Sequence, residues 1–147
     1  MRTRNSEWYE VKFQYKKTQE DGMQKKITEL YTVDALSFTE AESKITEEMK
    51  LYINGETFIK AITRASYKEI FFDDRESADK FYKAKLEFIT IDEKTEKEKK
   101  STITYLVQSE SLDGAKKSIN EVMDGTMIDY VIQSIAETKI MDVFEHK

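Results

Sequence analysis

The chain repeats its own residue pattern at a spacing of 74 positions. Residues 33–42 read VDALSFTEAE, and residues 107–116 read VQSESLDGAK. In both stretches a strand-like segment ends a few residues before a serine, Ser37 or Ser111, that is suited to cap the first turn of a helix. Such a repeat is typical of two similar supersecondary units that bury their apolar faces together.

Each serine is followed by apolar residues at helical spacing. In the first copy they are Phe38, Ala41, Ile45 and Met49, and in the second they are Leu112, Ala115, Ile119 and Met123. This spacing predicts two amphipathic helices. Glu40 stands three residues after Ser37 and predicts a capping box. Gly114 takes that place in the second copy, which predicts a less firmly fixed helix start.

The segments before each helix have the alternation of half-buried strands. Apolar residues occupy every second position of residues 8–15, and residues 81–88 repeat that pattern. Asp21-Gly22 is typical of a hairpin tip. We therefore predict an α+β fold, in which two tandem strand–strand–helix–strand repeats form mainly antiparallel sheet with two helices packed against it. The whole chain, 1–147, is expected to be one domain, with repeats at 8–72 and 81–144.

Composition limits the classes of function. The chain has 147 residues, of which 36% are charged, and a net charge of −5, which argues against a general nucleic-acid binder unless basic residues cluster locally. It has no cysteine, and His146 is its one histidine, so disulfides and cysteine or histidine metal sites are excluded or disfavoured. With no apolar leader or spanning run in the sequence, we expect a cytoplasmic protein.

No motif of catalysis stands out. The adjacent carboxylates at 47–48 and 73–74 lack the spacing of an oxygen-ligand site, and the four glycines form no phosphate-binding loop. We therefore expect no enzyme activity, no catalytic residue, no metal and no cofactor.

Several stretches resemble an uncharacterised family of small proteins from Bacteroidales bacteria, their phages and their mobile elements. They are Trp8-Tyr9, Val33 to Glu42, Glu69 to Asp73, Phe81 to Lys85, Gly125 to Tyr130 and Ile140 to Phe144. The resemblance extends over nearly the whole chain and brings no catalytic motif. It implies phage or mobile-element biology in a bacterial host cytoplasm.

Two ring–lysine pairs are the first candidate site. Trp8 with Lys12, and Phe81 with Lys85, lie on the strand faces opposite the apolar ones. Exposed rings beside cations are typical of single-stranded nucleic-acid platforms, where bases stack on rings and phosphates meet cations. The alternative is that the other repeat or a second subunit covers both rings.

Further lysines and arginines are the second candidate site. Lys60 and Arg64, with Lys68, are expected as a basic stripe on one strand, although the second repeat does not keep it. Lys16-Lys17 and Lys25-Lys26 flank the first hairpin loop. These lysines could contact a phosphate backbone. The alternative is an ordinary solvated loop, because Glu20 and Asp21 lie between the lysines and cancel much of their charge.

These features support two hypotheses. In the first, the chain is a non-enzymatic phage or mobile-element accessory protein that binds single-stranded nucleic acid on an aromatic and basic sheet face. In the second, it is an oligomeric interaction or anti-defence protein, a partner of its own copies, that sequesters a host protein or a nucleotide signal. Exposed rings at Trp8 and Phe81 favour the first, and buried rings favour the second.

Overall fold

The structure, a computed structural model, describes residues 2–146 in nine strands and two helices. In chain order they are β1 (Arg2–Asn5), β2 (Trp8–Thr18), β3 (Gln24–Asp34), α1 (Phe38–Met49), β4 (Thr57–Arg64), β5 (Glu69–Phe72), β6 (Lys80–Ile91), β7 (Glu98–Ser109), α2 (Leu112–Asp124), β8 (Asp129–Glu137) and β9 (Ile140–Phe144). Strands pair mostly antiparallel in two mixed sheets, so the predicted α+β class is confirmed. Among these residues, neither helix is long and apolar enough to cross a membrane.

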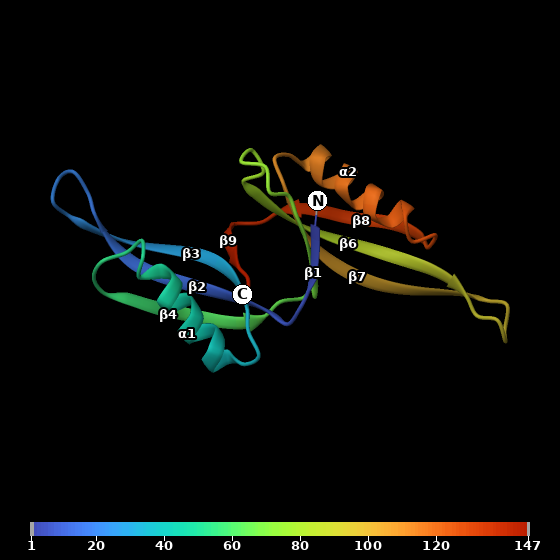
Figure 1. Ribbon diagram of the computed structural model, residues 1–147, viewed down its shortest axis with the longest axis horizontal. Helices are drawn as coiled ribbons and strands as arrows, with labels where there is room; N and C mark the ends of the chain where they lie inside the picture. Colours follow the sequence, from blue (N-terminus) through green and yellow to red (C-terminus); the bar gives the residue numbers. More distant parts are fainter. Residues whose placement is uncertain (1, 147) are drawn as a thin grey trace. The chain divides into compact units, whose positions relative to one another are not determined.

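The chain divides into two compact units. Unit 1 comprises residues 2–5 and 66–138, and unit 2 comprises residues 6–65 and 139–146. The sheet of unit 1 has the order β1-β5-β7-β6-β8, and that of unit 2 has the order β4-β2-β3-β9. Figure 1 shows one helix beside the sheet of each unit, α2 in unit 1 and α1 in unit 2.

Unit 2 is built on a long antiparallel hairpin. Strands β2 and β3 pair without interruption from Trp8 opposite Asp34 to Thr18 opposite Gln24. Strand β4 pairs antiparallel with the other edge of β2, and β9 pairs parallel with β3. Helix α1 buries Ile45 completely among apolar residues of this sheet, which explains the helical spacing seen in the sequence.

Unit 1 has the same order of elements around its own core. Strands β6 and β7 form the hairpin, α2 follows, and β8 pairs antiparallel with β6. Helix α2 buries Ile119 completely, among residues that include Tyr82, Leu86 and Val107. Two further strands extend the sheet, since β5 pairs parallel with β7 and β1 pairs antiparallel with β5.

The last strand of each predicted repeat lies in the sheet of the other unit. Strand β5 follows β4 in the chain yet belongs to unit 1, and β9 follows β8 yet belongs to unit 2. The units therefore differ in their bounds from the repeats at 8–72 and 81–144. The connections, residues 65–68 and 138–139, contain no glycine, asparagine or proline that would favour folding straight back as a hairpin.

Both helices begin with the same serine cap. The Ser37 hydroxyl oxygen accepts from the backbone N–H of Glu40 at 3.1 Å, and that of Ser111 accepts from Gly114 at 3.0 Å. No return bond from the Glu40 side chain occurs among the described residues, so the capping-box prediction is wrong. Glycine at 114 leaves room for Ser109, because a Cβ there would clash with the Ser109 hydroxyl oxygen unless that side chain moved.

Candidate functional site: a tyrosine-lined cleft

The two aromatic rings singled out from the sequence are buried. Trp8 is 2% exposed and Phe81 is 3% exposed. Their neighbours Tyr9 and Tyr82 pack in the helix-covered cores, so Trp8 and Phe81 face the opposite sides of their sheets. Large aromatic side chains gain most from losing contact with water. Neither ring therefore offers an open face on which a base could stack. Burial of both rings favours the second hypothesis, in which the chain is an oligomeric interaction or anti-defence protein.

The lysines paired with these rings remain exposed. Lys12 lies on β2 and Lys85 on β6, so each unit carries one of them. Lys60 is also exposed, and it lies at the bulge of β4 beside Ala61, the cross-strand partner of Lys12. The structure thus brings Lys12 and Lys60 close together along the sheet of unit 2.

Arg64 does not join this pair. It stands opposite Tyr9, on the sheet face that α1 covers, and its guanidinium lies 5.7 Å from the ring centroid of Phe38. Glu7 is within 3.7 Å of the guanidinium and partly compensates its charge. Lys68 follows the end of β4 and belongs to unit 1, so the expected stripe on one strand is wrong.

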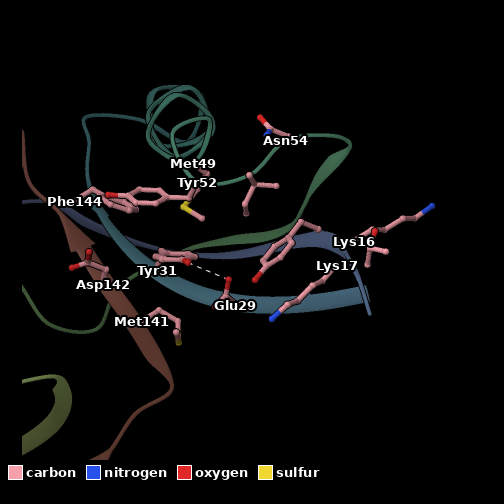
Figure 2. Close-up of a pocket in the computed structure, with 13 residues that line it drawn as sticks. Lys16, Lys17, Glu29, Tyr31, Met49, Tyr52, Asn54, Met141, Asp142 and Phe144 are labelled. Atoms are coloured by element: carbon pink, nitrogen blue, oxygen red, sulfur yellow. Dashed lines mark hydrogen bonds between the residues drawn. The ribbon is translucent and has the colours of Figure 1, made fainter. Parts of the chain in front are cut away.

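A different feature, a cleft of about 640 Å³, stands out in unit 2. Its volume is within the range of small-molecule sites. We call it the tyrosine cleft, and it is defined by Tyr15, Glu29, Tyr31, Tyr52, Asp142 and Phe144. Figure 2 shows Met141 and Asp142 of β9 on one side of it, Met49 at the end of α1 and Tyr52 of the following loop on another, and Lys16 and Lys17 at one end.

Glu29 organises the floor of the tyrosine cleft. Its carboxylate accepts a hydrogen bond from the Tyr31 hydroxyl at 3.3 Å, drawn as a dashed line in Figure 2. Burial first, and then the hydrogen bond and negative charge of Glu29, raise the pKa of Tyr15. Burial and Glu29 also raise the pKa of Tyr31. Both hydroxyls therefore stay protonated as donors at neutral pH and supply no phenolate nucleophile.

The rings of the tyrosine cleft differ in their exposure to solvent. The Tyr31 ring is buried and stacks on Phe144, with 5.5 Å between centroids and 21° between planes. Tyr52, in the loop after α1, is 74% exposed. A buried aromatic floor with an exposed ring beside it is an arrangement that can hold a flat ligand by stacking.

The hairpin next to the tyrosine cleft carries unmatched positive charge. Lys16 stands directly opposite Lys26, and Lys17 directly opposite Lys25. Like charges in such cross-strand pairs destabilise a sheet. Within residues 2–146, no ion pair joins any of these four lysines to a carboxylate.

The hairpin of unit 1 lacks this arrangement. There Lys99 stands opposite Thr90, and Lys100 stands opposite Ile89 with its ammonium 3.8 Å from the Glu87 carboxylate. Among the residues that the structure describes, charge compensation by a neighbouring acid is therefore found in the β6–β7 hairpin and not at the four lysines of the β2–β3 hairpin.

The adjacent carboxylates at 73–74 each form an ion pair with an arginine. Asp73 lies 2.6 Å from the guanidinium of Arg75, whose hydrogen bond lowers the pKa of that carboxyl. Asp74 pairs with Arg2 at 3.3 Å. In the part of the chain that the structure describes, no group of three or more histidine or acidic side chains could hold a metal ion.

Sequence reasoning missed Glu29, Tyr52 and Phe144 as members of a site. The alternation predicted only that Tyr15 lies on the apolar face of its strand, and nothing in the sequence pattern singled out Tyr31. The exact pairing of the lysines was not predictable from the turn signal, because a two-residue turn at Asp21-Gly22 would place Lys17 opposite Lys26, whereas in the structure the strands end at Thr18 and Gln24 and Lys17 stands opposite Lys25. Nothing in the sequence indicated that β9 would pair with β3 and complete the cleft.

The comparisons with known proteins identify a family and no activity. A family model described as a domain of unknown function, DUF4494, matches residues 7–146, which is nearly the whole chain. No curated protein matches the sequence, and no solved structure matches the fold.

Proposed function

The chain belongs to the DUF4494 family, whose function is unknown, and we propose that it is a non-enzymatic binding module that captures a nucleotide in the tyrosine cleft. The observation that carries the proposal is the combination of aromatic rings, carboxylates and lysines around one cleft of small-molecule size. Each of these three groups matches one part of a nucleotide.

The rings match the base. Tyr52 is open on its exposed side, and stacking of a base on an aromatic ring contributes about 1–3 kcal/mol. The carboxylates of Glu29 and Asp142 are hydrogen-bond acceptors, which suits the exocyclic amino group of a base. Lys17 at one end of the cleft suits a phosphate, because its ammonium supplies positive charge and three donors.

The same residues argue for capture without turnover. The Tyr15 and Tyr31 hydroxyls stay protonated, and histidine and cysteine do not occur among the cleft residues. A ligand held this way would be sequestered. Sequestration of a nucleotide signal fits an accessory role in phages or mobile elements of Bacteroidales, which the family resemblance implies and which is part of this proposal.

We favour nucleotide capture over binding of single-stranded nucleic acid because Trp8 and Phe81 are buried. A platform needs open rings, and these two are closed. Lys12 with Lys60, and Lys85 in the other unit, still offer phosphate contacts. Binding of an oligonucleotide that depends on these lysines, and not on Tyr52, would reverse the order of the two proposals.

Replacing Tyr52 with alanine should weaken binding of adenosine or guanosine monophosphate by about 1–3 kcal/mol, because one stacking surface is lost. Tyr52 is mostly exposed, so the melting temperature should change little. Isothermal titration calorimetry measures the affinities of wild type and variant.

The neighbouring residue supplies a matched control. Leu51 is 79% exposed and does not line the cleft, so Leu51→Ala should leave the affinity unchanged. Equal losses for both variants, or no binding of either nucleotide by the wild type at millimolar concentration, would refute capture in the tyrosine cleft.

A further inference from the structure

We propose that Lys17 and Lys25 form a phosphate site at the end of the tyrosine cleft, so that the captured ligand is a nucleotide with two or more phosphates. This inference rests on the proposed function and specifies the chemical class of its ligand. It is argued from the register of the hairpin, from the balance of charge along it and from the spacing between rings and lysines.

The register puts the two lysines on the face of the cleft. Side chains alternate along the β2–β3 hairpin, which pairs without a bulge. Tyr15 faces the cleft, so Lys17 and its partner Lys25 share that face. Lys16 and Lys26 project from the opposite face by the same alternation.

The spacing suits a nucleotide. Lys17 lies two residues beyond Tyr15 on the same strand, about 7 Å along it. A ring stacked near the tyrosines therefore places its phosphates, one sugar away, within reach of the flexible lysine side chains. Two ammonium groups opposite one another supply six N–H donors, which suits the oxygens of two neighbouring phosphates.

The charge balance leaves these ammonium groups available. Directly opposed like charges repel, and neither lysine has an ion-pair partner among the described residues. The acids of the hairpin tip form no ion pair with them: Asp21 accepts a hydrogen bond from the backbone N–H of Met23, and Glu20 lies beyond the last strand pair. On the other side, Glu29 holds the tyrosine hydroxyls. An anion would relieve the repulsion.

The test uses inorganic tripolyphosphate as a probe that has phosphates and no ring. For the full chain at low salt, we expect it to raise the melting temperature and to bind measurably by calorimetry. Lys17→Glu should weaken this binding roughly 10-fold or more, because it removes a charge-assisted contact and adds a repelling carboxylate. The same variant should raise the melting temperature of the free protein by about 1–5 °C, because Lys25 then faces an opposite charge.

Lys26→Glu is the matched control. It makes the same change of charge on the same hairpin and relieves the Lys16–Lys26 repulsion, but on the face away from Tyr15. It should stabilise the free protein similarly and keep the affinity for tripolyphosphate within about twofold, since a partly screened charge on the far face acts weakly. Equal weakening by both variants would show a diffuse basic hairpin and overturn the phosphate site.

Nucleotides separate this inference from the proposed function. Affinity should rise from adenosine to its monophosphate and again to its diphosphate, and Lys17→Glu should abolish the second increase. If the monophosphate binds in a Tyr52-dependent way while the diphosphate gains nothing, the phosphate site is wrong and nucleotide capture stands. If no nucleotide binds but tripolyphosphate does, the proposed nucleotide capture is wrong, and the lysines form a site for inorganic polyphosphate only.

Discussion

Replacing Ile45 with alanine should lower the free energy of unfolding by about 2–5 kcal/mol. The side chain is completely buried in α1 and packs in the core of unit 2. Alanine would remove three carbon atoms from that core and leave a space that the surrounding β-sheet and helix can fill only in part. The same change at Ile119, completely buried in α2, should have an effect of the same size on unit 1.

Urea unfolding followed by circular dichroism and by the fluorescence of Trp8, the one tryptophan, measures both effects. Ile91→Ala is the control, since it makes the same chemical change at a side chain that is 70% exposed, and it should cost less than about 0.5 kcal/mol. A loss that small for Ile45→Ala or Ile119→Ala would show that the helix face in question is not part of a core.

Ending the chain at Lys139 should destabilise unit 2 by on the order of 3–5 kcal/mol, comparable with removal of a buried phenylalanine. The deletion removes β9, and with it the parallel pairing to β3 and the stacking of Phe144 on Tyr31. It also removes the backbone N–H of His146, which donates to the Asp34 carboxylate at 3.4 Å. The edge of β3 and the Tyr31 ring would both become exposed to water.

Thermal unfolding and nucleotide titration of the shortened chain measure the two consequences, loss of stability and loss of one wall of the tyrosine cleft. Met141→Ala changes an exposed side chain of the same strand and should alter the melting temperature little. A shortened chain with the melting temperature of the full chain would contradict the pairing of β9 with β3.

The hairpins, the helices and their buried faces could be predicted because they depend on local patterns. Alternation around Tyr9 and Tyr82, and helical spacing around Ile45 and Ile119, each specify which side of an element is apolar. The partners of β5 and β9 could not be predicted. Both are short apolar strands, and a period of two residues identifies a strand without identifying the sheet that receives it.

The site was harder to predict than the fold for the same reason. Trp8 and Phe81 lie on the polar faces of their strands, and burial on those faces depends on tertiary packing that alternation does not encode. The tyrosine cleft combines β2, β3, the loop after α1 and β9. Only its hairpin part, including the facing lysines, is local in sequence.

The proposal that the tyrosine cleft is a nucleotide site is tested most directly by nuclear magnetic resonance of the full chain titrated with adenosine diphosphate. The amide resonances of Tyr15, Lys17, Tyr52 and Phe144 should shift together and saturate at one dissociation constant, while those of Lys12 and Lys85 should stay in place. Resonances of the cleft that do not move, or shifts centred on Lys12 and Lys85, would contradict it.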